Sequence, residues 1–225
     1  MPGALVPLIE PQSAHEGEVE RVYRQLQAWL RDAVLQPGQF LSEPGLARQC
    51  QTSRTPVREA CMRLHQDAWL SRYPKKGWLV TPISTRDIVD LYQYRKLLEC
   101  YTAEKTAQSI SATQLAELRA LLTAELRPGA GTPVLLAANE AFHLRLSALA
   151  GNERVHRQLE LTLAFAHRLD VLYMQEDATW IVHDDLLAAL EVHHGEGARR
   201  AMAAHLDHAQ DCLVKLFGQH SPFAR

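Results

Sequence analysis

Histidine gathers in the C-terminal part of this chain of 225 residues, where nine of the 11 histidines lie between residues 143 and 220. Asn139 and His143 are four residues apart, a spacing that places two side chains on one face of a helix. His183 and His205 are 22 residues apart, and a helix, a turn and an antiparallel helix can return the chain to the same level over that interval. These four residues could therefore meet at one point.

The chemistry that these four side chains could perform is metal binding. Three neutral imidazoles and an oxygen ligand suit zinc, nickel or a similar divalent transition metal, with one position left open for water or another ligand. The spacing leaves a second interpretation open, in which the four residues are ordinary core or surface side chains.

A second group of residues carries positive charge. Residues 42–81 contain seven Lys and Arg residues against three Asp and Glu, although the net charge of the whole chain is −2. A small basic segment joined to a larger acidic one is typical of a nucleic-acid-binding module carried by a further domain, and chance clustering is the alternative.

Within this basic segment, Arg54 and Arg58 are four residues apart and share a face near the start of a predicted helix. Arginine in such a position can donate to both O6 and N7 of guanine in the major groove. Two lysines in a turn could reach phosphates or a minor groove, and the glycine after them would allow close approach. The predicted DNA-contacting residues are Arg48, Arg54, Thr55, Arg58, Lys75, Lys76 and Gly77.

The basic residues need a scaffold, and the sequence around them predicts one. Apolar residues between 18 and 35 recur at helical spacing. Ser42 is a candidate N-cap for a short helix that ends near Cys50, and a third helix begins within residues 52–56. Two β-prone runs then flank a turn at Pro74–Gly77. This order predicts a winged helix-turn-helix.

The remainder of the chain is expected to be helical. We predict six helices joined by short connections, which favours an antiparallel α-helical bundle. The fold class is therefore mainly α, with a flexible tail at 1–15, a DNA-binding domain at 16–82 and a helical effector-binding and dimerisation domain at 83–225. The predicted helices span 85–109, 112–127, 132–150, 152–174, 177–194 and 196–218.

The run Thr52–Ala60, followed by Arg63 and Leu64, resembles the DNA-binding domain of GntR-family transcriptional regulators. The stretch Asp87–Tyr92, with Arg95 and Glu99, is similar to the opening of the FadR-type effector domain, called FCD. The resemblance extends from about residue 18 to 215, and six C-terminal helices favour the VanR-like branch. It implies a regulator whose operator binding is controlled by a small organic acid.

The resemblance also implies roles for particular residues in the C-terminal domain. FadR-type domains frequently carry an Asp-x3-His pair followed by two further histidines, and Asn139, His143, His183 and His205 match these positions. Asparagine replaces the aspartate here, so the oxygen ligand is weaker and supplies no charge. The same resemblance places Arg95 inside the bundle, facing a carboxylate effector. Considered by itself, Arg95 could instead form a surface salt bridge with Glu99, four residues on. The predicted effector-binding residues are Arg95, Asn139, His143, His183 and His205.

Three departures from the family pattern concern the DNA-binding domain. Gln51 and Ala68 stand where glycine is usual, at positions that commonly favour φ > 0 and that cost a non-glycine residue on the order of 1 kcal/mol. Pro44 and Gly45 replace a usual Arg-Glu-like pair, which removes one expected arginine contact.

We therefore predict a bacterial transcriptional regulator that binds double-stranded operator DNA as a homodimer, because a two-fold symmetric operator needs two recognition helices. Four scattered cysteines and the lack of a signal peptide favour the cytoplasm, and no apolar run approaches the ~20 residues of a membrane helix. We expect no enzymatic activity. The alternative function is a metal-dependent enzyme that acts on a small acid at a three-histidine site.

Overall fold

The computed structural model of the chain describes residues 17–123, 131–173 and 183–220. The chain divides into two compact units, residues 1–83 and 84–225. The predicted tail at 1–15 lies outside the described residues.

The first unit is a winged helix-turn-helix, as the sequence predicts. Three helices precede a β-hairpin, and a short strand that the sequence did not predict pairs with its second strand. β3 lies in the centre of a three-stranded antiparallel sheet, in the order β1-β3-β2. The elements are α1 (Glu18–Arg31), β1 (Phe40–Leu41), α2 (Glu43–Gln49), α3 (Arg54–Gln66), β2 (Leu70–Tyr73) and β3 (Gly77–Val80).

Local chemistry fixes the turn that positions α3. The hydroxyl of Ser42 accepts a hydrogen bond from the backbone N–H of Gly45 at 3.2 Å, so the predicted N-cap of α2 is present. Gln51 and Ala68 adopt φ values of 53° and 63°, the left-handed conformation predicted for both positions. The backbone geometry that favours glycine is therefore kept although the glycines are absent.

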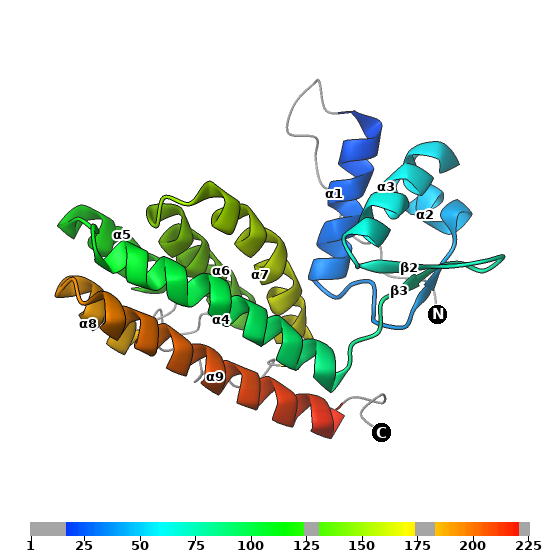
Figure 1. The fold of residues 1–225 in the computed structure, drawn as a ribbon. Coiled ribbons are helices and arrows are strands. Elements are labelled where there is room, and N and C mark those ends of the chain that lie inside the picture. The colour runs from blue at the N-terminus through cyan, green and yellow to red at the C-terminus, as the bar shows by residue number, and fades with distance from the viewer. Residues whose placement is uncertain (1–16, 124–130, 174–182, 221–225) are drawn as a thin grey trace. The chain divides into compact units, whose positions relative to one another are not determined.

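The second unit contains six helices in its described part (Figure 1). Three predicted helices are only partly described, because residues 124–127, 174 and 177–182 lie outside the described residues. The helices are α4 (Thr85–Ala107), α5 (Ala112–Thr123), α6 (Thr132–Leu149), α7 (Glu153–Tyr173), α8 (Asp184–Glu191) and α9 (Gly195–His220).

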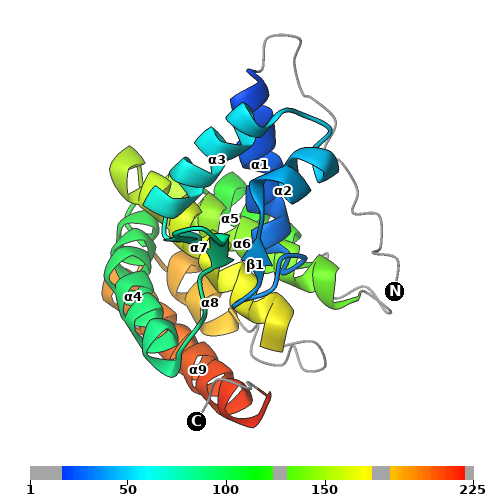
Figure 2. The ribbon, with the colours of Figure 1, turned by 90° about the vertical axis from the view of Figure 1, so that its right-hand side faces the viewer.

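The most extensive helix packing in this unit is between α4 and α9, which lie side by side and antiparallel (Figures 1 and 2). A capping box starts α4: Ser84 accepts a hydrogen bond from the N–H of Asp87, and the Asp87 carboxylate accepts one from the N–H of Ser84. α6 and α7 also pack against α4. Residues of α4, α6, α7 and α9 can therefore meet inside the bundle.

In the described part of the chain, no helix is both long enough and apolar enough to cross a membrane.

Candidate functional site

The three predicted histidine ligands come together inside the second unit. His143 lies on α6, His183 is the N-cap residue of α8, and His205 lies on α9. All three side chains are buried, and one potential ligand atom from each lies within 4.8 Å of the others. Three residues that are separated by 40 and by 22 positions in the chain thus bring their imidazoles to one point.

The spacing between two of these rings fits a shared metal ion. Nε2 of His143 lies 3.3 Å from Nε2 of His183. Two nitrogens that each lie about 2.0–2.1 Å from a tetrahedral zinc ion are about 3.3–3.4 Å apart. Without an ion, one nitrogen must donate a proton to the other, because two lone pairs facing each other repel.

Asn139 lies one helical turn before His143 on α6 and is also buried. Its side-chain oxygen has no hydrogen-bond partner among the described residues. Buried oxygens are rarely left without a partner, so a bound ion or ligand would satisfy this one. The donor set of three imidazoles and one amide oxygen fits a divalent transition metal.

The electrostatics of the cluster keep a ligand in its metal-binding form. Burial lowers the pKa of His183 well below its usual value, and the neighbouring His205 and His143 lower it further. His183 is therefore neutral near pH 7, and a neutral imidazole offers a lone pair to a metal.

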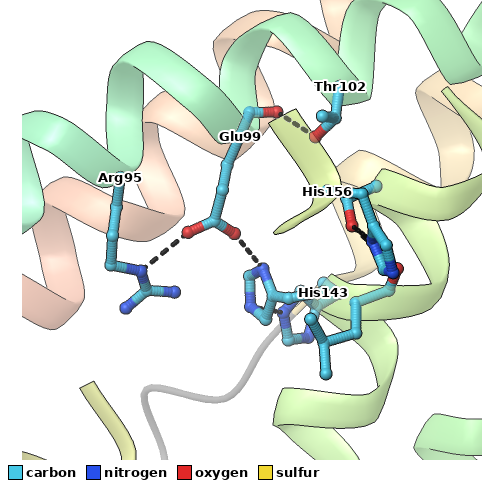
Figure 3. A network of polar contacts seen from close by, with 8 residues as sticks. Arg95, Glu99, Thr102, His143 and His156 are labelled. Carbon is cyan, nitrogen blue, oxygen red and sulfur yellow. Dashed lines mark hydrogen bonds and ion pairs between the residues drawn. The ribbon is translucent and has the colours of Figure 1, made fainter. Parts of the chain in front are cut away.

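Arg95 and Glu99 form a buried ion pair on α4, which extends to the histidine cluster (Figure 3). Nε of Arg95 donates to Oε1 of Glu99 at 2.7 Å, and Oε2 of Glu99 contacts Nδ1 of His143. Burial alone would raise the pKa of Glu99, but the charge of Arg95 and the contact with His143 outweigh it and lower the pKa to about 2. Glu99 is therefore an ionised carboxylate inside the bundle.

The sequence allowed Arg95 to lie inside the bundle or to form a surface salt bridge with Glu99, and the structure shows one part of each. Arg95 lies inside the bundle, and its partner is Glu99, four residues on, in a pair that is buried rather than on the surface. The guanidinium carbon also lies 4.7 Å from the centre of the Tyr92 ring.

The predicted DNA-contacting side chains lie on the surface of the first unit. Arg54, Thr55 and Arg58 are exposed in the first turns of α3, and Arg48 is exposed on α2. Lys75 and Lys76 are exposed in the turn between β2 and β3. The structure thus presents the α3 arginines and the hairpin lysines to solvent.

Arg58 has a partner that the sequence did not predict. Its Nε and Nη2 atoms donate to the Glu43 carboxylate of α2, at 3.1 Å and 2.8 Å. The Arg58 side chain nevertheless remains 65% exposed. The ion pair fixes one edge of the guanidinium and leaves the other edge available for hydrogen bonds.

Comparison with known proteins identifies both units. Residues 18–80 match the bacterial regulatory proteins of the gntR family, and residues 90–208 match the FCD domain. The chain belongs to the GntR family. Together the two matches cover the winged helix-turn-helix and most of the helical bundle, so this GntR-family protein is a transcriptional regulator with an FCD domain.

Individual relatives agree with this assignment. The GntR-family chain is 31% identical to the Nta operon transcriptional regulator of Aminobacter aminovorans over 138 residues, which are 60% of this chain and 66% of that protein. It is 26% identical to the HTH-type transcriptional repressor RspR of Escherichia coli over 211 residues, 90% of this chain and 91% of RspR. The structure of E. coli McbR/YncC has the same fold, with a TM-score of 0.73 at 24% identity, over 92% of this chain and 100% of that one.

In this GntR-family regulator, Gly77 is required by the packing of the wing itself. Its φ is +98°, and a Cβ atom built there would lie 2.4 Å from the carbonyl oxygen of Leu41 in β1. The sequence interpretation ascribed this glycine to close approach of DNA. The contact with β1 explains the glycine without DNA.

Sequence reasoning missed two acidic residues of the FCD domain. It named Glu99 as part of the family resemblance and as a possible surface partner of Arg95 but gave it no role at the metal site, and it did not single out Asp170, which is buried on α7. Burial raises the pKa of Asp170 to about 8; Arg95 opposes this rise and Glu140 adds to it. Neither residue has a local signal in the sequence: Asp170 follows His167 and Arg168 on α7, and the contact of Glu99 with His143 depends on tertiary packing.

Proposed function

We propose that this regulator binds double-stranded operator DNA through α3 and the hairpin, and that a small carboxylate effector controls this binding from a metal site in the FCD domain. The observation that carries the second part is the buried cluster of His143, His183 and His205, with ligand atoms within 4.8 Å of one another. Such a cluster is costly to bury unless its polar atoms find partners.

The metal would be zinc or nickel, held by the three histidines with Asn139 as the fourth, weaker ligand. A bound ion would supply a positive charge to which a ligand can coordinate. All four donors are neutral, and the Glu99 carboxylate is already paired with Arg95. The donor atoms themselves therefore offset none of the charge of the ion, as an aspartate ligand would, and this favours an anionic effector.

We infer that a carboxylate group of the effector completes the coordination, and that Arg95 pairs with a carboxylate of the same molecule. Glu99 holds Nε of Arg95. The terminal nitrogens of the guanidinium would then donate to the effector. The proposed effector site thus consists of Arg95, Asn139 and the three histidines.

The alternative function, a metal-dependent enzyme, needs a general base or acid beside the open coordination position. Among the described residues, the carboxylate in contact with the cluster is Glu99, which contacts Nδ1 of His143, on the other side of the ring from the Nε2 that faces His183. Both of its oxygens have partners, so it is poorly placed to activate a metal-bound water. This favours a regulator without enzymatic activity.

The domain arrangement that we propose is a DNA-binding domain at 16–82 and an effector and dimerisation domain at 83–225. A homodimer would present two α3 helices to a two-fold symmetric operator. A DNA-binding regulator of this family would act in the bacterial cytoplasm. The six helices of the described bundle favour the VanR-like branch of the FadR-type proteins.

The test of the metal site is elemental analysis of the protein purified without added metal or chelator. We expect about one zinc or nickel ion per chain, and loss of the ion in His183→Ala and His205→Ala. Asn139→Asp should tighten metal binding, because a carboxylate is a stronger ligand than an amide. His208→Ala, at an exposed position three residues after His205, is the matched control and should keep the metal.

The same variants test effector control. A gel shift on operator DNA, with and without a panel of small organic acids, should show a response in the parent and in His208→Ala only. Binding without effector should persist in all variants, because the DNA-binding residues lie in the other unit. Histidine variants that respond like the parent would place the pocket elsewhere, and turnover of any of the acids would support the enzyme instead.

A further inference from the structure

Glu99 lies between two residues that the proposed function uses. One carboxylate oxygen accepts a hydrogen bond from Arg95 on the same helix, and the other contacts Nδ1 of His143 on α6 (Figure 3). Arg95, Glu99 and His143 are almost completely buried. The three side chains therefore form one continuous chain of polar contacts from the proposed effector-binding arginine to a proposed metal ligand.

The contact with Glu99 decides which nitrogen of His143 carries the proton. A neutral imidazole has one N–H, on either Nδ1 or Nε2. A carboxylate oxygen in contact with Nδ1 repels a lone pair there and attracts a proton, so Nδ1 is the protonated atom. The lone pair is then on Nε2, the atom that lies 3.3 Å from Nε2 of His183.

The negative charge of Glu99 can compensate for the absence of a charged ligand at Asn139. The four residues of the donor set are all neutral, so none of them offsets the charge of an ion. A carboxylate that accepts the N–H of a coordinating histidine makes the ring a stronger donor and places negative charge close to the metal. Nε of Arg95 donates to this carboxylate at 2.7 Å, and a guanidinium beside a buried carboxylate favours its charged form.

We propose that Glu99 is a positioning residue for metal binding: it holds His143 in the ligand tautomer and supplies, through His143, the negative charge that Asn139 does not provide. This inference rests on the proposed metal site, and it adds a residue that does not itself touch the ion. It also makes Arg95 part of the metal site, because Arg95 orients Glu99.

The test compares zinc affinity in Glu99→Gln, Glu99→Ala and Asp90→Asn, which replaces an exposed acidic residue of the same helix. Each full-length protein is stripped of metal and titrated with zinc against a competing chelator. We expect Glu99→Gln to bind zinc about tenfold more weakly and Glu99→Ala about a hundredfold more weakly. Glutamine keeps an acceptor for the His143 N–H but loses the charge, whereas alanine loses both. Asp90→Asn should bind like the parent.

A second measurement reads the tautomer directly and already decides the point on the parent protein. Nitrogen chemical shifts of the His143 ring in the metal-free parent should show a protonated Nδ1 and an unprotonated Nε2. In Glu99→Ala the ring should become a mixture of both tautomers. A purely structural role for Glu99 would lower the melting temperature of the variants without changing either the tautomer or the zinc affinity of the folded fraction.

The two measurements separate the inference from the proposed function. If the parent binds no zinc, the proposed metal site is wrong, and the ring shifts alone decide whether Glu99 positions His143. If the parent binds zinc but Glu99→Gln matches it within a factor of two, the metal site stands and the role of Glu99 is overturned. A parent ring protonated on Nε2 would overturn the inference by itself, even if neither variant folds.

Discussion

The two units of this chain use the same kind of ion pair in opposite ways. Arg58 and Glu43 form a pair on the DNA-binding unit whose side chains are 65% and 19% exposed, whereas Arg95 and Glu99 form a pair in the bundle at 3% and 1%. An exposed pair contributes little to stability and can rearrange at low cost. A buried pair is expensive to desolvate and is stable only when each charge keeps a good partner.

This difference in burial suits the exposed pair to recognition of a partner and the buried pair to positioning of other side chains. Arg58 can exchange part of its contact with Glu43 for a base or a phosphate, because water and salt already weaken that contact. Glu99 has no such freedom, because leaving Arg95 unpaired in the bundle would be strongly unfavourable. The exposed charges of the first unit are therefore suited to binding DNA. The buried charges of the second unit are suited to keeping Arg95, Glu99 and His143 in one arrangement.

The largest expected effect on stability comes from Asp170, and it tests how much the burial of a charged group costs in the second unit. Its pKa is raised to about 8, whereas an aspartate in the unfolded chain titrates near ~3.9. The folded protein therefore holds a proton that the unfolded chain has released, and the free energy of unfolding falls as the pH rises from about 4 to about 8. Asp170→Asn, which does not titrate, should be more stable than the parent at pH 8, by on the order of a few kcal/mol.

The measurement for Asp170→Asn is calorimetric unfolding at pH 5 and pH 8, with a chelator present so that bound metal does not contribute. The advantage of the variant should shrink toward pH 5. The charged and titratable groups that interact with Asp170 are Arg95, Tyr92 and Glu140. Asp211→Asn, at an exposed position on α9, is the control and should follow the parent at both pH values. Equal pH profiles for Asp170→Asn and the parent would contradict the burial argument.

Gly77 tests whether the two units unfold separately. In Gly77→Ala the new Cβ would overlap the Leu41 carbonyl oxygen at a residue with φ of +98°, so both strain and overlap oppose folding of the wing. We expect a loss of about 2–4 kcal/mol, confined to the unfolding transition of the first unit. Gly151→Ala is the matched control in the second unit. Its φ is +73° and nothing lies within 4 Å of the added Cβ, so that transition should lose only about 1 kcal/mol. A single transition that shifts in both variants would show that the units unfold together.

Arg58→Ala tests the exposed pair. We expect specific operator affinity to fall about tenfold to a hundredfold, because an arginine on a recognition helix can read a base edge. A gel shift on operator and on unrelated DNA measures the loss, which should be larger on the operator. Arg86→Ala removes an arginine of the second unit whose partner is the exposed Asp90, and should leave binding unchanged. Equal operator affinity in folded Arg58→Ala would remove Arg58 from the interface.

The sequence predicted most of the fold from local patterns, and it predicted the membership of the histidine cluster from the resemblance to FadR-type domains. Helical spacing and cap residues are local, and His143, His183 and His205 match a pattern that can be read along the chain. The sequence did not predict β1, because a strand of two residues is too short to show an alternation of apolar and polar side chains. Its pairing with β3 also joins positions almost forty residues apart.

The residues that sequence reasoning missed all depend on packing between helices. An arginine and a glutamate four residues apart are common on exposed helical faces, so Arg95 and Glu99 alone do not reveal that α4 is covered by other helices. The pair between Arg58 and Glu43 joins two helices across 15 residues and has no local signature. The sequence could therefore indicate which side chains do chemistry, but the groups that orient them needed the tertiary structure.

The smallest expected effect belongs to Lys75, at the tip of the hairpin, where φ is +66° and the side chain is exposed. A lysine that meets a phosphate releases about one counterion, so Lys75→Ala should lower the slope of log K against log salt by ~0.9. The loss of affinity should be equal on operator and on unrelated DNA, because a phosphate contact carries no sequence information. Fluorescence anisotropy at several salt concentrations measures both quantities. A loss confined to the operator would mean that Lys75 reads a base, and the division between a base-reading α3 and a phosphate-binding hairpin would then be wrong.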